Sequence, residues 1–458
     1  MQKKCKFKGT TILLEFKAEN YRSFKDEFVF KMEPSPKKKD LLYSLLKQKI
    51  EKKTYTALCS SIIYGANAAG KSNIIGAIDT FREILKRGTI KDDISNKVPM
   101  NAAAYKLEVI PNNKLEEIKP VSFSIKFIND EILFEYILKI DLGAFMQPNY
   151  DRKILEEKLY VNNDLLFKRG EKVEILENKT LKKYINKNLP YSNKELFQMI
   201  ASASLKKDEL FLSNGFKNIF STYLYDVIRN WIDYKLTVIY ASMDFKAYLA
   251  PINENNSKIH DYINALAEVI GVNSNKICYL SEKDEAKPKL CSLFDKIKAI
   301  IPAELIESYG TIRLINLLMP LIDTLVNGTT LIIDEFDCSL HPMIVMSLIN
   351  LFHDNEININ NAQLIFNTHN PIFLNKNLFR RDEIKFVERE NDTFSILYSL
   401  ADFSTTGKNS VRKTTDYMRN YFINRYGAIK NINLIPLFEK ILSDPDIQLV
   451  KQEIKIEK

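Results

Sequence analysis

The sequence contains few of the residues that build disulfide frameworks or histidine-rich metal centres. Among 458 residues there are five cysteines, at positions 5, 59, 278, 291 and 338, and four histidines. The cysteines are odd in number, scattered and without a C-x-x-C pair. This favours free thiols in a reducing cytosol over a disulfide framework or a zinc site. The scarcity of histidine argues against a histidine-rich metal centre.

Long apolar runs are also lacking. The most apolar stretch, from Leu314 to Val326, is interrupted by Asn316, Pro320 and Asp323, so it is not expected to span a membrane. The lysine-rich N-terminus has no apolar signal core. The apolar fraction of 45% and the charged fraction of 27% are typical of globular proteins. We therefore expect a cytoplasmic protein of two or three subdomains with no membrane partner.

The positive charge is concentrated near the N-terminus. Residues 1–53 hold fifteen Lys or Arg against seven Asp or Glu, which equals the net charge of +8 of the whole chain. Such a surface can meet nucleic-acid phosphates. It can equally be a solvated lysine loop, because no aromatic or arginine stacking pattern accompanies it. Both interpretations stay open, and DNA remains a candidate partner.

One eight-residue stretch has the composition and the flanks of a phosphate-binding loop. It reads Gly65-Ala66-Asn67-Ala68-Ala69-Gly70-Lys71-Ser72. Residues 61–64 before it are typical of a buried strand, and residues 73–78 after it begin an amphipathic helix. In this setting backbone N–H groups turn toward an anion, and the helix N-terminus adds its positive end. The motif predicts that Lys71 reaches the β- and γ-phosphates of ATP and that Ser72 holds Mg²⁺.

Two further strands are expected to end in residues that suit nucleotide hydrolysis. The apolar strand expected at 329–334 runs into Asp334 and Glu335. Beside the phosphate loop, Asp334 can coordinate Mg²⁺ through water, and Glu335 can orient or deprotonate the attacking water. The strand expected at 362–367 is followed by His369, which we predict to donate a hydrogen bond to the γ-phosphate or to the attacking water.

Ser308-Tyr309-Gly310-Thr311 opens a helix expected at 311–326. The segment suits a plain helix N-cap. It also suits a second anion site, in which the helix N-terminus and a serine hydroxyl address a γ-phosphate. The sequence favours neither alternative.

The order of elements predicts an α/β nucleotide-binding core interrupted by a helical insertion. We expect an ATPase lobe formed by 1–143 and 301–400, a mostly helical insertion at 144–300, and a C-terminal extension at 401–458. The lobe carries the phosphate loop in its first part, and Ser308, Asp334, Glu335 and His369 in its second.

Taken together, these motifs resemble those of the ATP-binding-cassette (ABC) class of ATPases. In that comparison 65–72 corresponds to Walker A, 308–311 to the signature, 334–335 to Walker B with the catalytic glutamate, and His369 to the switch histidine. The chain resembles the RecF and OLD branch, and most closely the RloA-type ATPases of bacterial abortive-infection operons. This resemblance rests on the spacing of 237 residues from Lys71 to Ser308, on Asn67, and on the segments 20–24, 340–342, 368–371 and 425–429.

Two positions depart from the class. The signature lacks the usual Leu-Ser-Gly-Gly-Gln, and His341 stands at the D-loop aspartate position. The resemblance nevertheless implies an ABC-type head with a mixed sheet and a helical insertion. It also implies slow hydrolysis of ATP with Mg²⁺, and a homodimer in which Ser308 and Gly310 of one copy complete the Walker site of the other.

The resemblance suggests a function in phage defence. OLD nucleases carry a Toprim nuclease domain after the ATPase, whereas 89 residues follow His369 here, without a recognisable acidic cluster. We therefore expect a sensor or scaffold ATPase that controls a separately encoded effector. Two alternatives remain open: a RecF-like DNA-binding repair ATPase, and a self-sufficient nuclease or toxin with an unrecognised site.

Overall fold

The computed structural model describes residues 9–444 apart from a set of short gaps. The gaps are 37–40, 92–106, 148, 188, 190–193, 204, 241–256, 270, 272–275, 281–288, 391–392, 405–410, 412–414 and 431–432. Of the basic N-terminal segment, residues 1–8 and lysines 37–39 lie outside the described residues.

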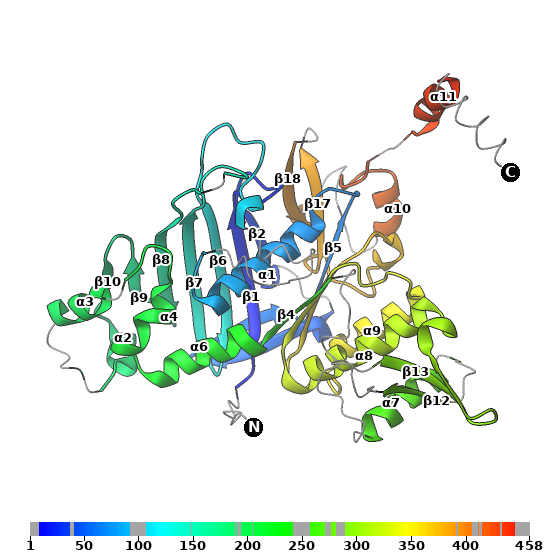
Figure 1. Ribbon diagram of the computed structural model, residues 1–458, viewed down its shortest axis with the longest axis horizontal. Coiled ribbons are helices and arrows are strands. Elements are labelled where there is room, and N and C mark those ends of the chain that lie inside the picture. Colours follow the sequence, from blue (N-terminus) through cyan, green and yellow to red (C-terminus); the bar gives the residue numbers. More distant parts are fainter. Residues whose placement is uncertain are drawn as a thin grey trace.

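Two large sheets form the body of the molecule (Figure 1). The first is antiparallel, in the order β10 (Val173–Ile175), β9 (Asp164–Arg169), β8 (Lys153–Val161), β7 (Ile132–Asp141), β6 (Val121–Asn129), β1 (Ile12–Glu19) and β2 (Phe28–Lys31). The second has the order β11 (Leu236–Ile239), β15 (Thr330–Ile333), β16 (Gln363–Asn367), β5 (Ser60–Gly65), β17 (Ile384–Glu390) and β18 (Phe394–Ser399). All strands of the second sheet run parallel except β18.

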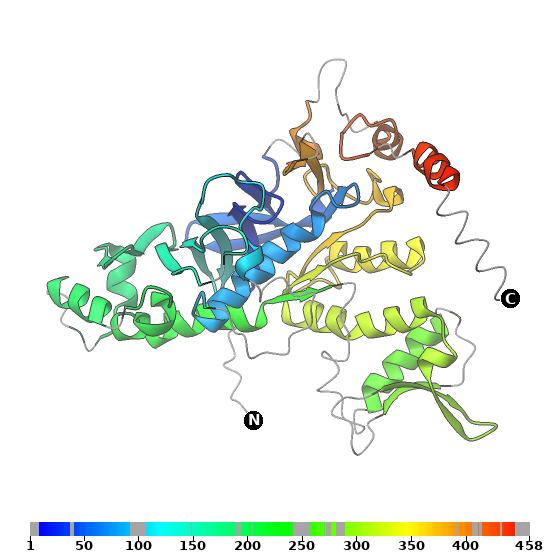
Figure 2. The ribbon, with the colours of Figure 1, turned by 45° about the horizontal axis from the view of Figure 1, so that its top comes forward.

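The parallel strands are buried on both faces, as their uninterrupted apolar sequences predict. In β5, for example, Ile63 joins one core cluster while Ile62 and Tyr64 join another. Helix α1 (Lys71–Arg87) packs in the first cluster, and α8 (Tyr309–Asn327) and α9 (Pro342–His353) pack in the second. The sheet is therefore covered by α1 on one face and by α8 and α9 on the other (Figure 2).

Helix α8 is the one helix in the described part of the chain with the length and hydropathy of a membrane span. It has 19 residues and a mean hydropathy of 1.2, and 39% of this window is buried. Its apolar residues Leu317 and Leu321 pack in the core with the parallel sheet. A core helix passes the same test, so the feature is weak evidence for a membrane segment.

Helix α1 also joins the two sheets, because its opposite side packs on the antiparallel sheet. Phe81 of α1 stacks on Phe123 of β6 with ring centroids 5.2 Å apart. At one point a single side chain connects the sheets directly. Gln363 of β16 accepts a hydrogen bond from Leu13 N (2.7 Å) and donates one to Leu13 O (3.1 Å), as a neighbouring strand would.

The prediction of a mostly helical segment at 144–300 is wrong for much of its length. Strand β8 pairs with β7, so the antiparallel sheet extends past residue 143, where the sequence predicts a domain boundary. The alternation of β8 is masked by Glu157, which is fully buried among apolar positions. Glu157 accepts hydrogen bonds from Tyr136, Arg169 and the N–H groups of Phe211 and Leu212.

Helices do occupy the next part of this segment. They are α2 (Lys179–Tyr184), α3 (Lys194–Ala203), α4 (Phe211–Asn214), α5 (Phe216–Ile219) and α6 (Thr222–Tyr234). The chain then returns to the core as β11, which is an edge strand of the parallel sheet.

A small unit follows and packs on α8. It consists of α7 (Ser257–Val269) and an antiparallel sheet of β12 (Lys276–Leu280), β13 (Lys289–Phe294) and β14 (Ala299–Pro302). Its core includes Ile263, Ile277 and Tyr279 together with Ile315 of α8. Figure 2 shows this unit beyond α8, on the side away from the parallel sheet.

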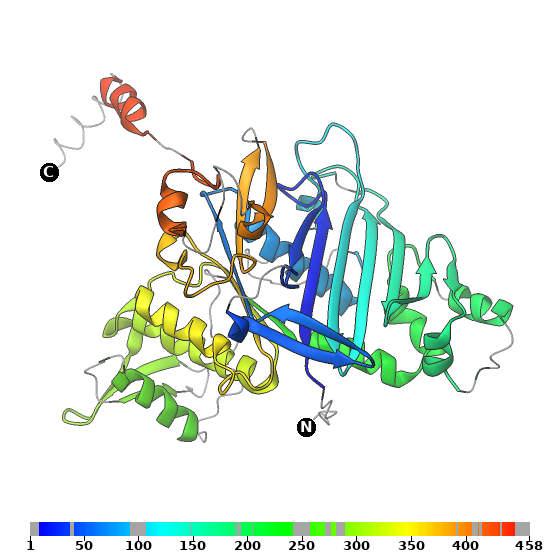
Figure 3. The same ribbon diagram turned by 180° about the vertical axis from the view of Figure 1, so that it is seen from behind.

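Three elements complete the fold. The hairpin of β3 (Leu45–Ile50) and β4 (Lys53–Leu58) packs across the end of β1, as Figure 3 shows from behind. Helix α10 (Tyr417–Phe422) lies near β17, and α11 (Ile435–Ser443) stands apart from the body in all three views.

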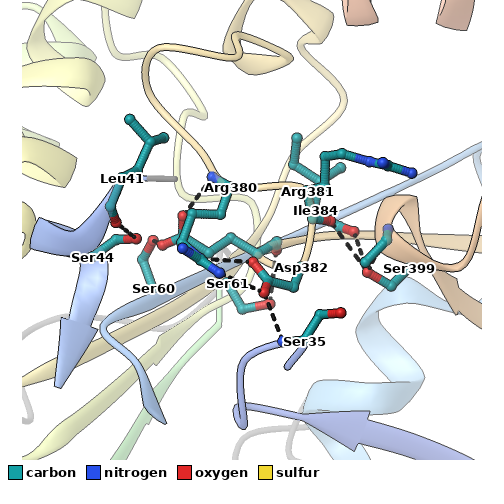
Figure 4. Close-up of polar contacts among 12 residues, drawn as sticks. Ser35, Leu41, Ser44, Ser60, Ser61, Arg380, Arg381, Asp382, Ile384 and Ser399 are labelled. Atoms are coloured by element: carbon teal, nitrogen blue, oxygen red, sulfur yellow. Dashed lines mark hydrogen bonds and ion pairs between the residues drawn. The ribbon is translucent and has the colours of Figure 1, made fainter. Parts of the chain in front are cut away.

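Polar contacts fix the strands at the amino edge of the parallel sheet. Figure 4 shows Arg380 turned toward Asp382, whose carboxylate also accepts a hydrogen bond from Ser35 N. Ser61 donates to Glu383 O (3.0 Å), which holds β5 beside the start of β17. The opposite, carboxyl edge of the sheet is where parallel α/β folds place their ligands.

Candidate functional site

The loop from Gly65 to Ser72 leaves the carboxyl end of β5 and leads directly into α1. Its glycines stand where no side chain fits. A Cβ at Gly65 would lie 2.4 Å from Val387 O, and one at Gly70 would lie 2.6 Å from Ser395 Oγ. Gly70 also has a φ of +115°, in the region that favours glycine. The loop is thus held by close contacts with β17 and β18.

Lys71 lies inside this loop. It is buried, and its Nζ donates to Gly65 O (2.8 Å) and Ala66 O (3.1 Å). Burial lowers the pKa of Lys71 to about 8, although the charges of Asp334 and Glu335 oppose that shift. A desolvated ammonium gains from an anionic partner, so the loop is suited to bind phosphate groups.

Ser72 and Asp334 meet at the carboxyl edge. Ser72 Oγ donates to Asp334 Oδ1 across 2.8 Å. A hydroxyl and a carboxylate are hard oxygen donors, the type that Mg²⁺ prefers. The two residues therefore fit an Mg²⁺ ion bound together with a nucleotide.

Asn367 at the end of β16 joins Asp334 to the next residue, Glu335. Its Nδ2 donates to Asp334 Oδ1, and its Oδ1 accepts from Glu335 N across 2.6 Å. Glu335 itself has a φ of +51°, which is uncommon for a residue with a side chain. The backbone therefore turns sharply at Glu335, and Asn367 stabilises that turn.

His369 lies against the phosphate loop. Its Nδ1 is 3.4 Å from Lys71 Nζ. Since an ammonium group can only donate, Nδ1 accepts and Nε2 carries the proton. Burial, and then the charge of Lys71, lower the pKa of His369 below its ordinary value, so the imidazole is neutral at pH 7. It is able to donate from Nε2 to a phosphate or a water molecule.

Ser308 is the N-cap of α8, where its Oγ accepts from Thr311 N (3.1 Å). Gly310 faces the loop that follows Glu335, because a Cβ there would lie 2.3 Å from Ser339 O. Ser308 is exposed, and in the described part of the chain its side chain bonds only to Thr311. The structure thus brings Lys71, Ser72, Asp334, Glu335 and His369 together, but it shows no contact of Ser308 or Gly310 with them.

A cavity of about 260 Å³ adjoins the phosphate loop. Arg22, Ser23, Asn73, Phe145 and Arg389 are among its lining residues. Asn73 donates to Ser23 Oγ (2.7 Å), and Arg389 donates to Ala68 O (2.8 Å). With two guanidinium groups and an aromatic ring, this cavity suits the base and sugar of a nucleotide.

Sequence reasoning missed Asn367 and Arg313. Arg313 is buried in α8 and donates from Nη2 to Glu335 O across 2.7 Å. A polar residue at the end of an otherwise apolar strand was the available signal for Asn367. For Arg313 the signal was a charged residue within an apolar helix.

Comparison with known proteins agrees with this geometry. The family model described as "AAA domain, putative AbiEii toxin, Type IV TA system" matches residues 60–375. No curated protein matches the chain.

Solved structures with a similar arrangement include two SMC head domains. One is the SMC head bound to the C-winged helix domain of ScpA (12% identity, 84% of this chain and 97% of that chain, TM-score 0.40). The other is the SMC head domain from Thermotoga maritima (14% identity, 84% and 98%, TM-score 0.36). The predicted α/β core is confirmed by the mixed, mainly parallel sheet, in which the phosphate loop follows β5.

Proposed function

The chain belongs to the AAA-domain family described with the AbiEii toxin, and on this premise we propose that it is an Mg²⁺-dependent ATPase that works as a homodimer. One observation carries the proposal. A single chain assembles Lys71, Ser72, Asp334, Glu335 and His369 at one sheet edge, while Ser308 at the N-terminus of α8 is exposed and has no hydrogen bond to any of them in the described part of the chain. A second copy is needed to bring such a helix end to the loop.

Each residue of the loop edge has a defined task in this proposal. Lys71 and the backbone N–H groups of the loop hold the phosphates of ATP. Ser72 and Asp334 would hold Mg²⁺, which neutralises charge on the phosphates. Glu335 orients or deprotonates the attacking water, and His369 donates a hydrogen bond from Nε2. The neutral imidazole is suited to this donation without adding a charge beside Lys71.

The surroundings of Ser308 support a protein–protein contact. Leu305 is 74% exposed, Ile306 47% and Tyr309 61%. Apolar side chains around a helix N-terminus form a rim that excludes water, and the backbone N–H groups of the N-terminus supply donors for an anion. ATP then drives closure of the dimer because its phosphates contact both copies only in the closed state.

For the cellular role we propose a cytoplasmic sensor or scaffold subunit of an anti-phage system that controls a separately encoded effector. The family description, which names a toxin–antitoxin system, supports this proposal. The same description also favours a second candidate, in which the chain itself is the toxin. Growth inhibition or nuclease activity from the purified chain alone, surviving Lys71→Ala, would favour the second candidate.

The homodimer is tested by trapping ATP. Glu335→Gln should slow hydrolysis and accumulate a dimer with ATP and Mg²⁺, measured by light scattering after size exclusion. Ser308→Arg in the same background is the matched variant, and we expect it to stay monomeric. A Glu335→Gln protein that binds ATP and remains a monomer would refute the shared site.

Complementation gives a second test. Lys71→Ala and Ser308→Arg each damage both sites of a homodimer, but their heterodimer would contain one intact composite site. Mixing the two inactive variants should therefore restore part of the ATPase activity, up to about half of the wild-type rate where every dimer is mixed, because each mixed dimer has one intact site of two. No recovery in isolated heterodimers would count against the proposal.

A further inference from the structure

An acidic residue stands directly before the proposed anion site. Glu307 immediately precedes Ser308, the N-cap of α8. If Ser308 and the N-terminus of α8 meet the γ-phosphate of ATP, a free carboxylate at this position would repel it. The position of the Glu307 side chain therefore matters for nucleotide binding.

The structure fixes that side chain through Ser292. Ser292 of β13 is fully buried, and its Oγ donates to Glu307 Oε1 across 2.9 Å. The backbone of Glu307 is held as well, because its N–H donates to Ala303 O (2.7 Å). The carboxylate is thus bonded to the small sheet of β12–β14.

The small sheet is itself attached to α8, so the anchor is fixed relative to the helix. Tyr279 of β12 donates to Asn316 Oδ1 on α8 across 2.6 Å. Ile263 and Ile277 pack with Ile315 of α8 in one core cluster. Ser292 therefore cannot move away from Glu307 without disturbing this packing.

We propose that Ser292 is a positioning residue for ATP binding in the homodimer, because it holds the carboxylate of Glu307 away from the phosphate site at the N-terminus of α8. The inference rests on the proposed function. It assigns to the small unit of α7 and β12–β14 a direct effect on the composite ATP site. Any ligand that displaces β13 would act on ATP binding through the same bond.

The test uses the ATP-trapping Glu335→Gln background. Adding Ser292→Ala should raise the dissociation constant of the ATP-dependent dimer about three- to tenfold at low salt. This is the effect expected when the negative charge of Glu307 lies about 8 Å from a phosphate. Adding Glu307→Gln to Ser292→Ala should restore dimerisation. The loss of dimerisation caused by Ser292→Ala should also be smaller at about 0.5 M salt, because salt at that concentration screens exposed charges beyond a few ångström.

Tyr279→Phe is the matched control. It removes a hydroxyl that bonds the same sheet to α8 but involves no carboxylate, so it should cause no salt-dependent loss. Unchanged dimerisation of the Ser292→Ala variant, or failure of Glu307→Gln to restore it, would overturn the inference and leave the shared site intact. If the Glu335→Gln parent does not dimerise, the proposed function fails and the inference fails with it.

Discussion

Arg313 of α8 donates a hydrogen bond across 2.7 Å to the backbone carbonyl of Glu335. The two residues belong to different halves of the proposed site. Arg313 lies one turn into the helix that begins at Ser308, and Glu335 carries the carboxylate proposed to act on water. A displacement of α8 would therefore act directly on the backbone at Glu335, which has an uncommon positive φ.

Replacing Arg313 by methionine should reduce catalysis more than nucleotide binding. A hydrogen bond from a charged group contributes about 1.5–3 kcal/mol, so we expect kcat to fall about tenfold or more while KM for ATP changes little. Steady-state ATPase assays measure both constants. Arg229→Met is the control, because Arg229 pairs with Asp233 on α6 and lies outside the site. Similar kinetic losses in both variants would show that Arg313 acts on stability alone.

Asn367→Leu should weaken the response to Mg²⁺. The change removes the hydrogen bond from Asn367 to Asp334 and the one from Glu335 N to Asn367. The Mg²⁺ concentration for half-maximal activity should therefore rise, and kcat should fall about tenfold or more. A titration of ATPase activity with Mg²⁺ at saturating ATP measures this. Asn358→Leu removes another buried asparagine, which bonds to the backbone near Ala362. It should lower stability without changing the Mg²⁺ dependence, and a shift in both variants would contradict the prediction.

The parts of the site that could be predicted from the sequence are those whose function depends on local geometry. Gly70 needs its φ of +115° within a single strand–loop–helix unit, although the atoms that exclude a Cβ at Gly65 and Gly70 belong to Val387 and Ser395 in other strands. Strands at 330–333 and 363–367 agree with the expected ranges, since buried parallel strands are short apolar runs. Asp334 and His369 then follow from their position after these strands.

The parts of the fold and of the site that could not be predicted from the sequence depend on contacts between distant segments. Asn367 has its role because β16 lies between β15 and β5, an order that the chain sequence does not contain. The sequence of β8 does not indicate a strand, because its Lys and Glu residues hide the alternation of buried and exposed positions. Its buried Glu157 is tolerated through hydrogen bonds from Arg169 and from the first two N–H groups of α4. The pairing of β8 with β7, rather than local propensity, decides its structure.

The pH dependence of ATP capture should report Lys71. In the free protein its pKa is lowered to about 8, so kcat/KM for ATP should fall as pH rises above 8 and the ammonium loses its proton. Bound phosphates stabilise the charged form, so the corresponding fall in kcat should occur at higher pH. His369, whose pKa is lowered by burial, should not contribute to the alkaline fall. Lys71→Arg should remove the alkaline fall in kcat/KM, and its persistence would assign that fall to another group.

Lys71 should also destabilise the protein while no nucleotide is bound. Its pKa is lower in the folded chain than the ordinary 10.5, so folding carries a cost that is fully present below pH 8 and disappears above 10.5. Lys71→Met should therefore raise the free energy of unfolding at pH 7 by about 1–2 kcal/mol, after the loss of its hydrogen bonds. The gain should shrink between pH 8 and 10, and Lys86→Met, at a half-exposed position of the same helix, is the control for removing a lysine. Thermal unfolding with and without ATP and Mg²⁺ measures both effects.

ATP should stabilise the parent and not Lys71→Met, because only the parent offers the phosphates a buried cation. A Lys71→Met protein that is less stable than the parent at pH 7 would show that the bonds of Lys71 to Gly65 and Ala66 outweigh its desolvation.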